Sequence, residues 1–534
     1  MRRIWMLGYL WAASTLCAQQ VWTLGWEDYE NKVHGAWLGQ IIGTLLGFEF
    51  EGKIASSESV WVDQYPSNDP RSPRVLGWAP VDDDYYYELV ALRAFERFGL
   101  GMTLDQLGEQ WKANAAGSWG SSRETRLALM RGIPGSQTGH PRNNRWWWTI
   151  GPQFSADIYG MLAPGNPNLA ARLASTYGRI NGHAEAVDGA VFVAGMVSLA
   201  FRETDVRRIV REAAALIPNS SPYRQCLNQV IALAEAGYPA RAVTEAIENR
   251  WRPVYPAVNN AVANGGLVAA SVWFGGGDFL RTLNLAFRAA DFSDADCNAA
   301  NAGAVVGAMV GHRGLPAHLV EPLNDRIRGE RLGDVHLSPP VDEQISDIVR
   351  RTVRLGRQLM LQHGARDLGQ AFQIEIQPPV MVATERFTLA DLARLWNADW
   401  ELERAGFGGM SSGGCERATY LSGDMLVTWP QDEARGVLLR REVVLTGAPQ
   451  LELEVGAQAG CAWQLTVAAN NTIVTTELIE GASDASPSWR TLRLDLTRFA
   501  GQLVELRLYQ RTSLRRATAG SAYWRRIELT NTNR

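Results

Sequence analysis

Apolar residues recur at helical spacing through most of the first 370 residues of the chain. Such spacing gathers them on one face of each helix, where they can be buried together. Many segments rich in Ala and Gly, with no alternating strand pattern between them, predict an all-α bundle over residues 25–370. The clearest predicted helices span residues 86–98, 184–201, 258–274, 298–310 and 344–363.

Glycine recurs every fourth residue in the apolar run 36–50, at Gly35, Gly39, Gly43 and Gly47. A helix with glycine along one face lets a second backbone approach closely. In a membrane this pattern is typical of a dimer face, but the flanking residues are wrong for a membrane span. The repeat therefore predicts a tightly packed helix in the core.

The pattern changes to strict alternation after about residue 377. Short alternating segments separated by turn residues predict an antiparallel β-sandwich (jelly roll) over residues 431–534. The segment 378–430, with its glycine-rich stretches, is expected to be a linker or mixed segment. The predicted strands are residues 436–445, 450–455, 463–469, 490–496 and 503–509.

Length and composition fit a folded chain of two or three domains: it has 534 residues, 46% hydrophobic and 20% charged. The net charge of −4 argues against a nucleic-acid binder that works through a basic surface. Composition does not indicate an oligomeric state.

The N-terminus predicts export. Arg2 and Arg3 precede a short apolar run over residues 4–16, so residues 1–18 are expected to be a signal peptide cleaved near Ala18. The mature protein is then secreted or periplasmic. Cys17 leaves a lipid anchor as an alternative, although the residues before it match a lipobox poorly. We expect no membrane span, since no later apolar run is long and clean enough.

Four cysteines remain after removal of the signal, which is too few for a disulfide scaffold in a chain of this size. Cys415 and Cys461 fall in the same late region and could pair, which only geometry decides.

Two acidic clusters, 210 residues apart, suggest the chemistry: Val81-Asp82-Asp83-Asp84-Tyr85 and Ser293-Asp294-Ala295-Asp296-Cys297. Aspartate is favoured at helix starts, but capping needs one or two aspartates and leaves the third unexplained. Hard divalent ions are held by oxygen ligands of this kind. The five aspartates are therefore predicted metal ligands at one site, possibly for two ions. Cys297 is an odd neighbour for a hard ion and could simply pack as a small apolar residue.

Three more residues are candidates with plainer alternatives. Glu51, at the end of the glycine-rich helix, could act as a general base or reach a metal, or be a solvated helix end. Asp157 and His183 could line a pocket, although a histidine before a buried helix is usually structural. The tryptophans at 146–148 could stack on a sugar or serve as packing.

These residues, in this order, resemble the ADP-ribosylglycohydrolase family over about residues 30–370. The resemblance implies an all-α orthogonal helical bundle with two Mg²⁺ (or Mn²⁺) ions that position ADP-ribose while water cleaves the glycosidic bond. It implies metal ligation by Asp82, Asp83, Asp84, Asp294, Asp296 and Cys297, catalytic roles for Glu51 and Asp83, and substrate binding by Asp157 and His183.

The chain departs from the family pattern in three places. Gly43-Thr44-Leu45 stands where many members have Gly-Asp-Ala, Tyr85 where a Thr usually follows the aspartates, and Cys297 where the late Thr or Ser ligand belongs. A weakened second metal site or a changed substrate would follow. The late β-domain resembles a galactose-binding-like, carbohydrate-binding module, with Trp489 to Leu496 as its best match.

The leading hypothesis is a secreted, metal-dependent glycohydrolase acting on a small-molecule, glycan or ADP-ribosyl substrate. One alternative is a non-catalytic carbohydrate-binding protein with a degenerate helical domain. Another is a glycoside or nucleoside hydrolase on the same scaffold, including one that uses two carboxylates without metal.

Overall fold

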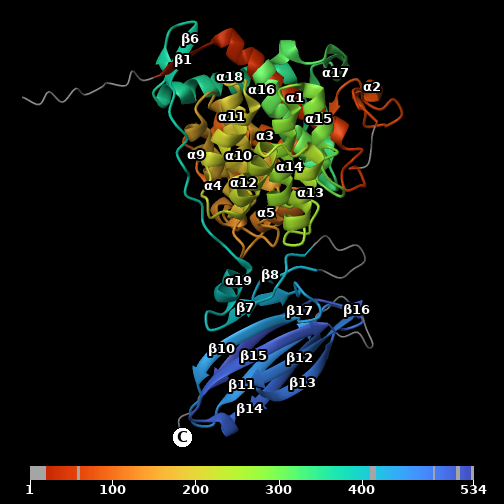
Figure 1. The fold of residues 1–534 in the computed structure, drawn as a ribbon, viewed down its shortest axis with the longest axis vertical. Coiled ribbons are helices and arrows are strands. Elements are labelled where there is room, and N and C mark those ends of the chain that lie inside the picture. Colours follow the sequence, from red (N-terminus) through yellow and green to blue (C-terminus); the bar gives the residue numbers. More distant parts are fainter. Residues whose placement is uncertain (1–19, 57–59, 409–416, 485–487, 513–517, 531–534) are drawn as a thin grey trace, which may run out of the picture.

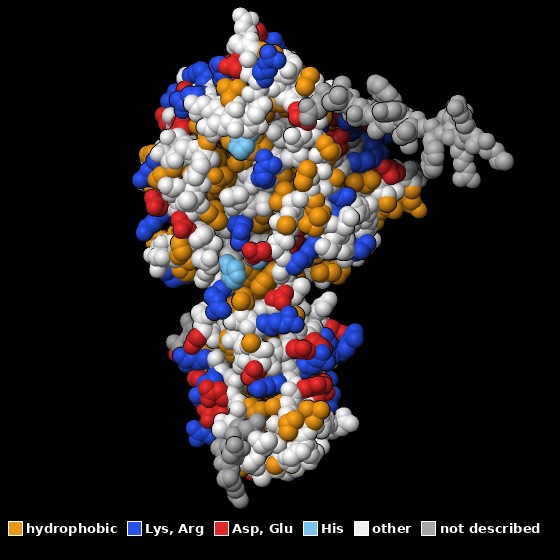
Figure 2. All heavy atoms as spheres, turned by 90° about the vertical axis from the view of Figure 1, so that its left-hand side faces the viewer, with side chains coloured by type: hydrophobic (Ala, Val, Ile, Leu, Met, Phe, Trp, Pro, Cys, Tyr) orange, Lys and Arg blue, Asp and Glu red, His pale blue; other side chains and the backbone are white. Residues whose placement is uncertain are grey.

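The computed structural model describes residues 20–530 except 57–59, 409–416, 485–487 and 513–517. The chain forms a helical unit and a β-sandwich, each with its own hydrophobic core. The two units lie end to end (Figure 1) and meet at a narrower waist (Figure 2). The predicted fold class, a helical bundle followed by an antiparallel sandwich, is confirmed. The predicted signal peptide lies outside the described residues.

Two helices form the centre of the helical unit: α1 (Trp26–Gly47) and α16 (Ala295–Val310). They pack through small residues, and the glycine repeat of α1 explains why. A Cβ atom at Gly35 would lie 2.2 Å from the carbonyl oxygen of Gly307, and one at Gly39 would lie 2.1 Å from that of Gly303. Side chains are thus excluded along the crossing, and the predicted core helix is confirmed.

The other predicted helices are also present. They are α3 (Asp83–Phe98), α10 (Glu185–Ala200), α14 (Ala261–Gly275) and α18 (Ile345–Gln362). Helices α8 (Asp157–Leu162) and α9 (Pro167–Tyr177) pack against α10. No described helix is long and apolar enough to cross a membrane.

The helical unit also contains two small three-stranded sheets, which the hydrophobic pattern did not predict. One has the order β1 (Val21–Gly25), β6 (Ala371–Glu375), β5 (Arg366–Asp367). The other has the order β2 (Ala79–Pro80), β3 (Arg326–Leu332), β4 (Val335–Gln344). The second sheet matters for the site, because Val81 N–H donates to Arg328 O at 2.8 Å and fixes the chain just before the first acidic cluster.

The sandwich consists of two sheets. One sheet has the strand order β13 (Thr472–Glu480), β12 (Cys461–Ala469), β15 (Leu503–Thr512), β10 (Val437–Val444), β7 (Glu401–Glu403). A short sixth strand, β16 (Thr518–Ala519), pairs with β12. The other has the order β14 (Ser488–Asp495), β11 (Gln450–Ala457), β17 (Ala522–Thr530), β9 (Met425–Thr428), β8 (Tyr420–Ser422). All five predicted strands are present.

The sandwich begins earlier than the expected boundary at residue 431. The segment 378–430 contains α19 (Leu389–Trp396), whose Leu392 lies in the sandwich core, and strands β7, β8 and β9. These strands have only three or four residues each, which is too short for an alternating pattern to be recognised. Strand β7 pairs with β10 and β9 pairs with β17, while β8 pairs with β9.

Two phenylalanines join the units. Phe387 contacts Trp147 and His183, at ring-centroid distances of 5.2 and 5.5 Å. Phe407 contacts Trp148 at 4.8 Å and stacks on Tyr255 at 5.1 Å. Trp147 and Trp148 are fully buried, so these tryptophans serve as packing where the units meet.

Candidate metal centre

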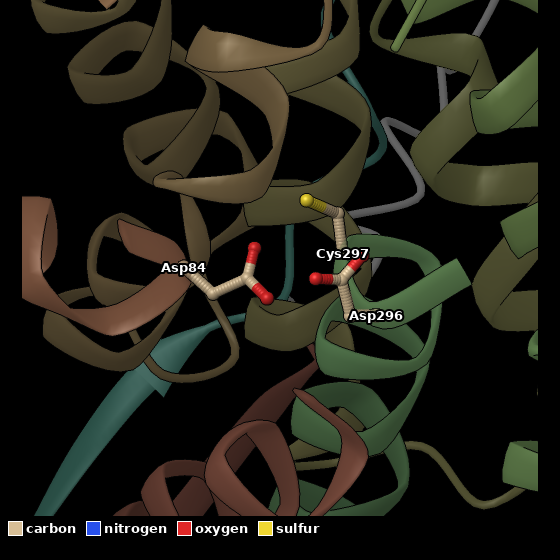
Figure 3. Close-up of side chains that lie close together, drawn as sticks. All are labelled: Asp84, Asp296 and Cys297. Carbon is tan, nitrogen blue, oxygen red and sulfur yellow. The ribbon is translucent and has the colours of Figure 1, made fainter. Parts of the chain in front are cut away.

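The two acidic clusters meet at one place, because the helices that follow them begin side by side. Asp84 lies in the first turn of α3, and Asp296 and Cys297 lie in the first turn of α16. One ligand atom from each of these three residues lies within 4.8 Å of the others. Figure 3 shows the carboxylate of Asp84 facing that of Asp296, with the sulfur of Cys297 on the same side of α16.

A second group of ligand atoms consists of carboxylate oxygens from Glu51, Asp294 and Asp296, again within 4.8 Å of one another. Glu51 lies in the turn after α1, and two backbone hydrogen bonds hold this turn against the loop before α16: Gly52 N–H donates to Ser293 O at 3.0 Å, and Phe292 N–H donates to Lys53 O at 2.7 Å. Asp296 belongs to both groups, so the geometry offers two adjacent positions that share one carboxylate.

Unpartnered buried oxygens test whether a cation fits these residues. Oδ1 of Asp84 and Oδ1 of Asp296 are buried and have no hydrogen-bond partner. Leaving a buried carboxylate oxygen without a partner is costly. Asp84 Oδ2, by contrast, accepts a hydrogen bond from Thr44 Oγ1 at 2.9 Å. The free oxygens and the acidic donor set therefore fit a divalent cation.

The carboxylates also disfavour one another's charge. Burial, followed by neighbouring acids, raises the pKa of Asp296 to about 6 and that of Asp82 to about 6. The pKa of Glu51 is raised to about 7, first by the charge of Asp296 and then by burial. Burial raises the pKa of Asp84 and Asp294 well above the usual range. So much repulsion is relieved by bound positive charge.

Asp82 and Asp83 lie beside these two groups rather than within them. Asp82 is the N-cap of α3, and its Oδ1 accepts a hydrogen bond from Asp84 N–H at 3.2 Å. The capping interpretation thus holds for Asp82. Burial, and after it the charges of the neighbouring aspartates, raises the pKa of Asp83 well above the usual range. Metal ligation by Asp82 and Asp83, and catalysis by Asp83, stay predictions.

Asp157 lies inside the bundle, where it is fully buried. Its Oδ2 accepts hydrogen bonds from Gln40 Nε2 at 3.1 Å and Asn301 Nδ2 at 2.8 Å. Gln40 Nε2 also donates to the backbone oxygen of Asp84 at 3.1 Å. Asp157 therefore connects α1 and α16 by hydrogen bonds, and Gln40 extends this connection to the start of α3. The carboxylate is fully buried, and substrate binding by Asp157 stays a prediction.

The structure does not bring His183 together with the acidic clusters. Its backbone N–H donates to Trp147 O at 2.9 Å, and its Nε2 lies 3.3 Å from Glu385 Oε2. The ring contacts Phe387, at the end of the helical unit that faces the sandwich. Burial lowers the pKa of His183 to about 4, which keeps the ring neutral near pH 7. Substrate binding by His183 stays a prediction.

The predictions from sequence missed the buried polar residues that form hydrogen bonds with Asp84 and Asp294. Thr44 and Gln40 act on Asp84, as described, and Asn264 Oδ1 accepts hydrogen bonds from Asp294 N–H at 3.3 Å and Asn298 Nδ2 at 2.9 Å. Each stands in an otherwise apolar stretch of a buried helix. A polar side chain in such a position needs a partner, and this is the signal that could have identified them.

Comparisons with known proteins place the helical unit in a family. The family model described as ADP-ribosylglycohydrolase matches residues 26–355. A solved structure titled "ADP-ribosylglycohydrolase-related protein complex" is 17% identical, with 62% of this chain and 99% of that chain covered and a TM-score of 0.40. One titled "CBM4 structure and function" is 14% identical, with 26% and 91% covered and a TM-score of 0.18. Among curated proteins, none matches the chain.

Proposed function

Because this chain belongs to the ADP-ribosylglycohydrolase family, we propose that it is a metal-dependent glycohydrolase. Its substrate carries an N- or O-glycosidic bond to ADP-ribose or a related ribosyl group. One observation carries the proposal: two groups of ligand atoms share Asp296 and leave buried carboxylate oxygens unpartnered. The comparatively exposed Glu51 leaves one side of the centre open to a substrate.

Asp84, Asp294, Asp296 and Cys297 would hold the metal. Two divalent ions, Mg²⁺ or Mn²⁺, would supply positive charge for orienting a ribose diol and a water molecule. Glu51 would accept a proton, on a carboxylate oxygen, from the water that attacks the anomeric carbon. Its position at the rim of the centre suits a general base.

The spacing of the acids favours this chemistry over a metal-free glycoside hydrolase. In metal-free enzymes the two carboxyl groups stand about 5–5.5 Å or about 6.5–9.5 Å apart, with a sugar or water between them. Here three carboxylates place oxygens within 4.8 Å of one another. At that distance they repel unless a cation lies among them.

Export of the protein is part of the proposal and is supported by the N-terminal sequence described above. A secreted enzyme would meet free ADP-ribosyl or glycosyl compounds rather than intracellular modified proteins. Secretion assays with and without residues 1–18 test this point.

We also propose that the sandwich binds a glycan on the outer face of its five-stranded sheet. Tyr523 pairs with Gly456, which pairs with Trp489, so the three share one face. The two rings lie 6.5 Å apart and are partly exposed. Such rings can stack on sugars. Binding of soluble polysaccharides that persists unchanged in a Trp489→Ala/Tyr523→Ala variant would reject this assignment.

Calorimetric titration of the metal-stripped protein with Mg²⁺ and Mn²⁺, beside an Asp83→Ala/Asp296→Ala variant, tests the main proposal. We expect saturable binding in the intact protein and none in the variant. Hydrolysis of ADP-ribosyl and glycosyl substrates should then require the added metal. Hydrolysis that withstands chelation would instead support the metal-free alternative, and absence of both binding and hydrolysis would leave a carbohydrate-binding protein.

A further inference from the structure

The two ligand groups of the centre differ in chemistry. Glu51, Asp294 and Asp296 offer only oxygen, whereas the other group combines the oxygens of Asp84 and Asp296 with the sulfur of Cys297. Oxygen ligands select hard ions such as Mg²⁺. A thiolate is soft and favours Zn²⁺, Co²⁺ or Fe²⁺ over Mg²⁺. The asymmetry therefore bears on which ion occupies each position.

Cys297 is placed to act as a ligand. It lies in the first turn of α16 with 6% of its surface exposed, and its Sγ atom is within 4.8 Å of oxygens on Asp84 and Asp296. Metal–sulfur bonds of about 2.3 Å and metal–oxygen bonds of about 2.0–2.2 Å hold the two ligand atoms about 3.6 Å apart at a tetrahedral ion, which is within the 4.8 Å limit found here. Oδ1 of Asp84 and Oδ1 of Asp296 are buried and lack partners on the protein.

A second buried cysteine shows the contrasting case, in which the thiol only fills space. Cys226, on α12 (Pro222–Glu235), packs against Gly266 and Ile247 between helices. It belongs to neither group of potential ligands found in the described part of the chain. Packing explains Cys226, whereas Cys297 lies among carboxylates, and its thiol hydrogen-bonds to Asp84 and Asp294.

We propose that Asp84, Asp296 and Cys297 bind a borderline divalent ion such as Zn²⁺, Co²⁺ or Fe²⁺ through the sulfur, while the oxygen-only position keeps Mg²⁺ or Mn²⁺. The inference rests on the proposed function, because it assigns the ions of the same centre. On binding, the sulfur gives up its proton to solvent and bonds to the ion. Asp296 would contribute a ligand oxygen to each of the two positions.

The test is spectroscopic and does not depend on turnover. The metal-stripped full-length protein is titrated with Co²⁺, and sulfur-to-cobalt charge-transfer absorption is recorded in the near ultraviolet. We expect one equivalent of Co²⁺ to produce this band. Cys297→Ser should abolish it, and the matched control Cys226→Ser should retain it. In competition with Mg²⁺, the Zn²⁺ preference of Cys297→Ser should fall roughly tenfold or more.

X-ray absorption of the Zn²⁺-loaded wild-type protein gives a second measurement that needs no variant. A sulfur neighbour at about 2.3 Å is expected. Co²⁺ or Zn²⁺ binding without any sulfur signature overturns the inference, as does a band that survives Cys297→Ser. If Mg²⁺-dependent hydrolysis persists in those cases, the proposed function stands and only the thiolate assignment fails. If the intact protein binds no ion, both fail.

Discussion

Replacing Gly47 by Ala should damage the metal centre through the backbone alone. A Cβ atom at Gly47 would lie 2.5 Å from the Cα atom of Asp296 and 2.9 Å from its backbone nitrogen. Ordinary contacts begin near 3.4 Å, so the start of α16 must retreat by roughly an ångström. Asp296 is the carboxylate that both ligand groups share, and it moves with that backbone.

The expected size of the effect follows from this displacement. Overpacking of this kind costs about 1–3 kcal/mol of folding free energy. Displacing a group that takes part in the reaction by about 1 Å lowers the rate roughly 100-fold. Gly47→Ala should therefore lose about 1–2 orders of magnitude in Mn²⁺ affinity and in metal-dependent hydrolysis, measured by calorimetry and by initial rates.

Two further variants test whether the effect depends on where the glycine lies and not merely on replacing a glycine by alanine. Gly39→Ala meets the carbonyl oxygen of Gly303 at 2.1 Å, so it should destabilise the fold as much while disturbing metal binding less, because the crossing there is two turns from Asp296. Gly101→Ala meets nothing within 4 Å and is exposed, so it should change neither property. Wild-type Mn²⁺ affinity in Gly47→Ala would refute the idea that the glycine repeat positions the centre.

Three other predictions concern charge and hydrogen bonding. Asp296→Asn should weaken Mg²⁺ and Mn²⁺ binding at both positions by roughly 100-fold or more in calorimetry, whereas Asp278→Asn, which alters the exposed N-cap of α15 (Phe279–Ala286), should leave it unchanged. Thr44→Val removes the hydrogen bond to Asp84 Oδ2, so it should reduce metal affinity roughly tenfold and cost about 1–3 kcal/mol of stability in the metal-free protein, because that buried oxygen is left without a partner; equal affinity would show that Thr44 does not orient this ligand. Burial raises the pKa of Glu185 from 4.5 to about 7, so the folded protein keeps a proton that the unfolded chain releases, and stability falls as pH rises through that window. Glu185→Gln should remove up to about 3 kcal/mol of this fall in urea unfolding between about pH 4.5 and pH 7.5; an unchanged slope would contradict the buried, protonated state.

Helical periodicity in the first 370 residues and alternation in the last hundred follow directly from which side chains water excludes. The sequence therefore determined the fold class, the main helices and five of the seven long strands in the described part of the sandwich; β13 and β17 were not predicted. It also identified the glycine repeat as a surface of close packing, since only a residue without Cβ permits it. Strands β7, β8 and β9 were not predictable, because segments of three or four residues become strands only through their pairing with β10, β17 and one another.

The sequence also determined which residues have the right chemistry for the centre, because adjacent carboxylates are costly without a cation. Only the tertiary structure decided which of them meet. The crossing of α1 and α16 brings Glu51, Asp294 and Asp296 together, and the start of α3 adds Asp84. His183 instead packs against Phe387 where the two units meet, and Asp157 lies inside the bundle, because long-range packing, which no local pattern encodes, decides which residues meet.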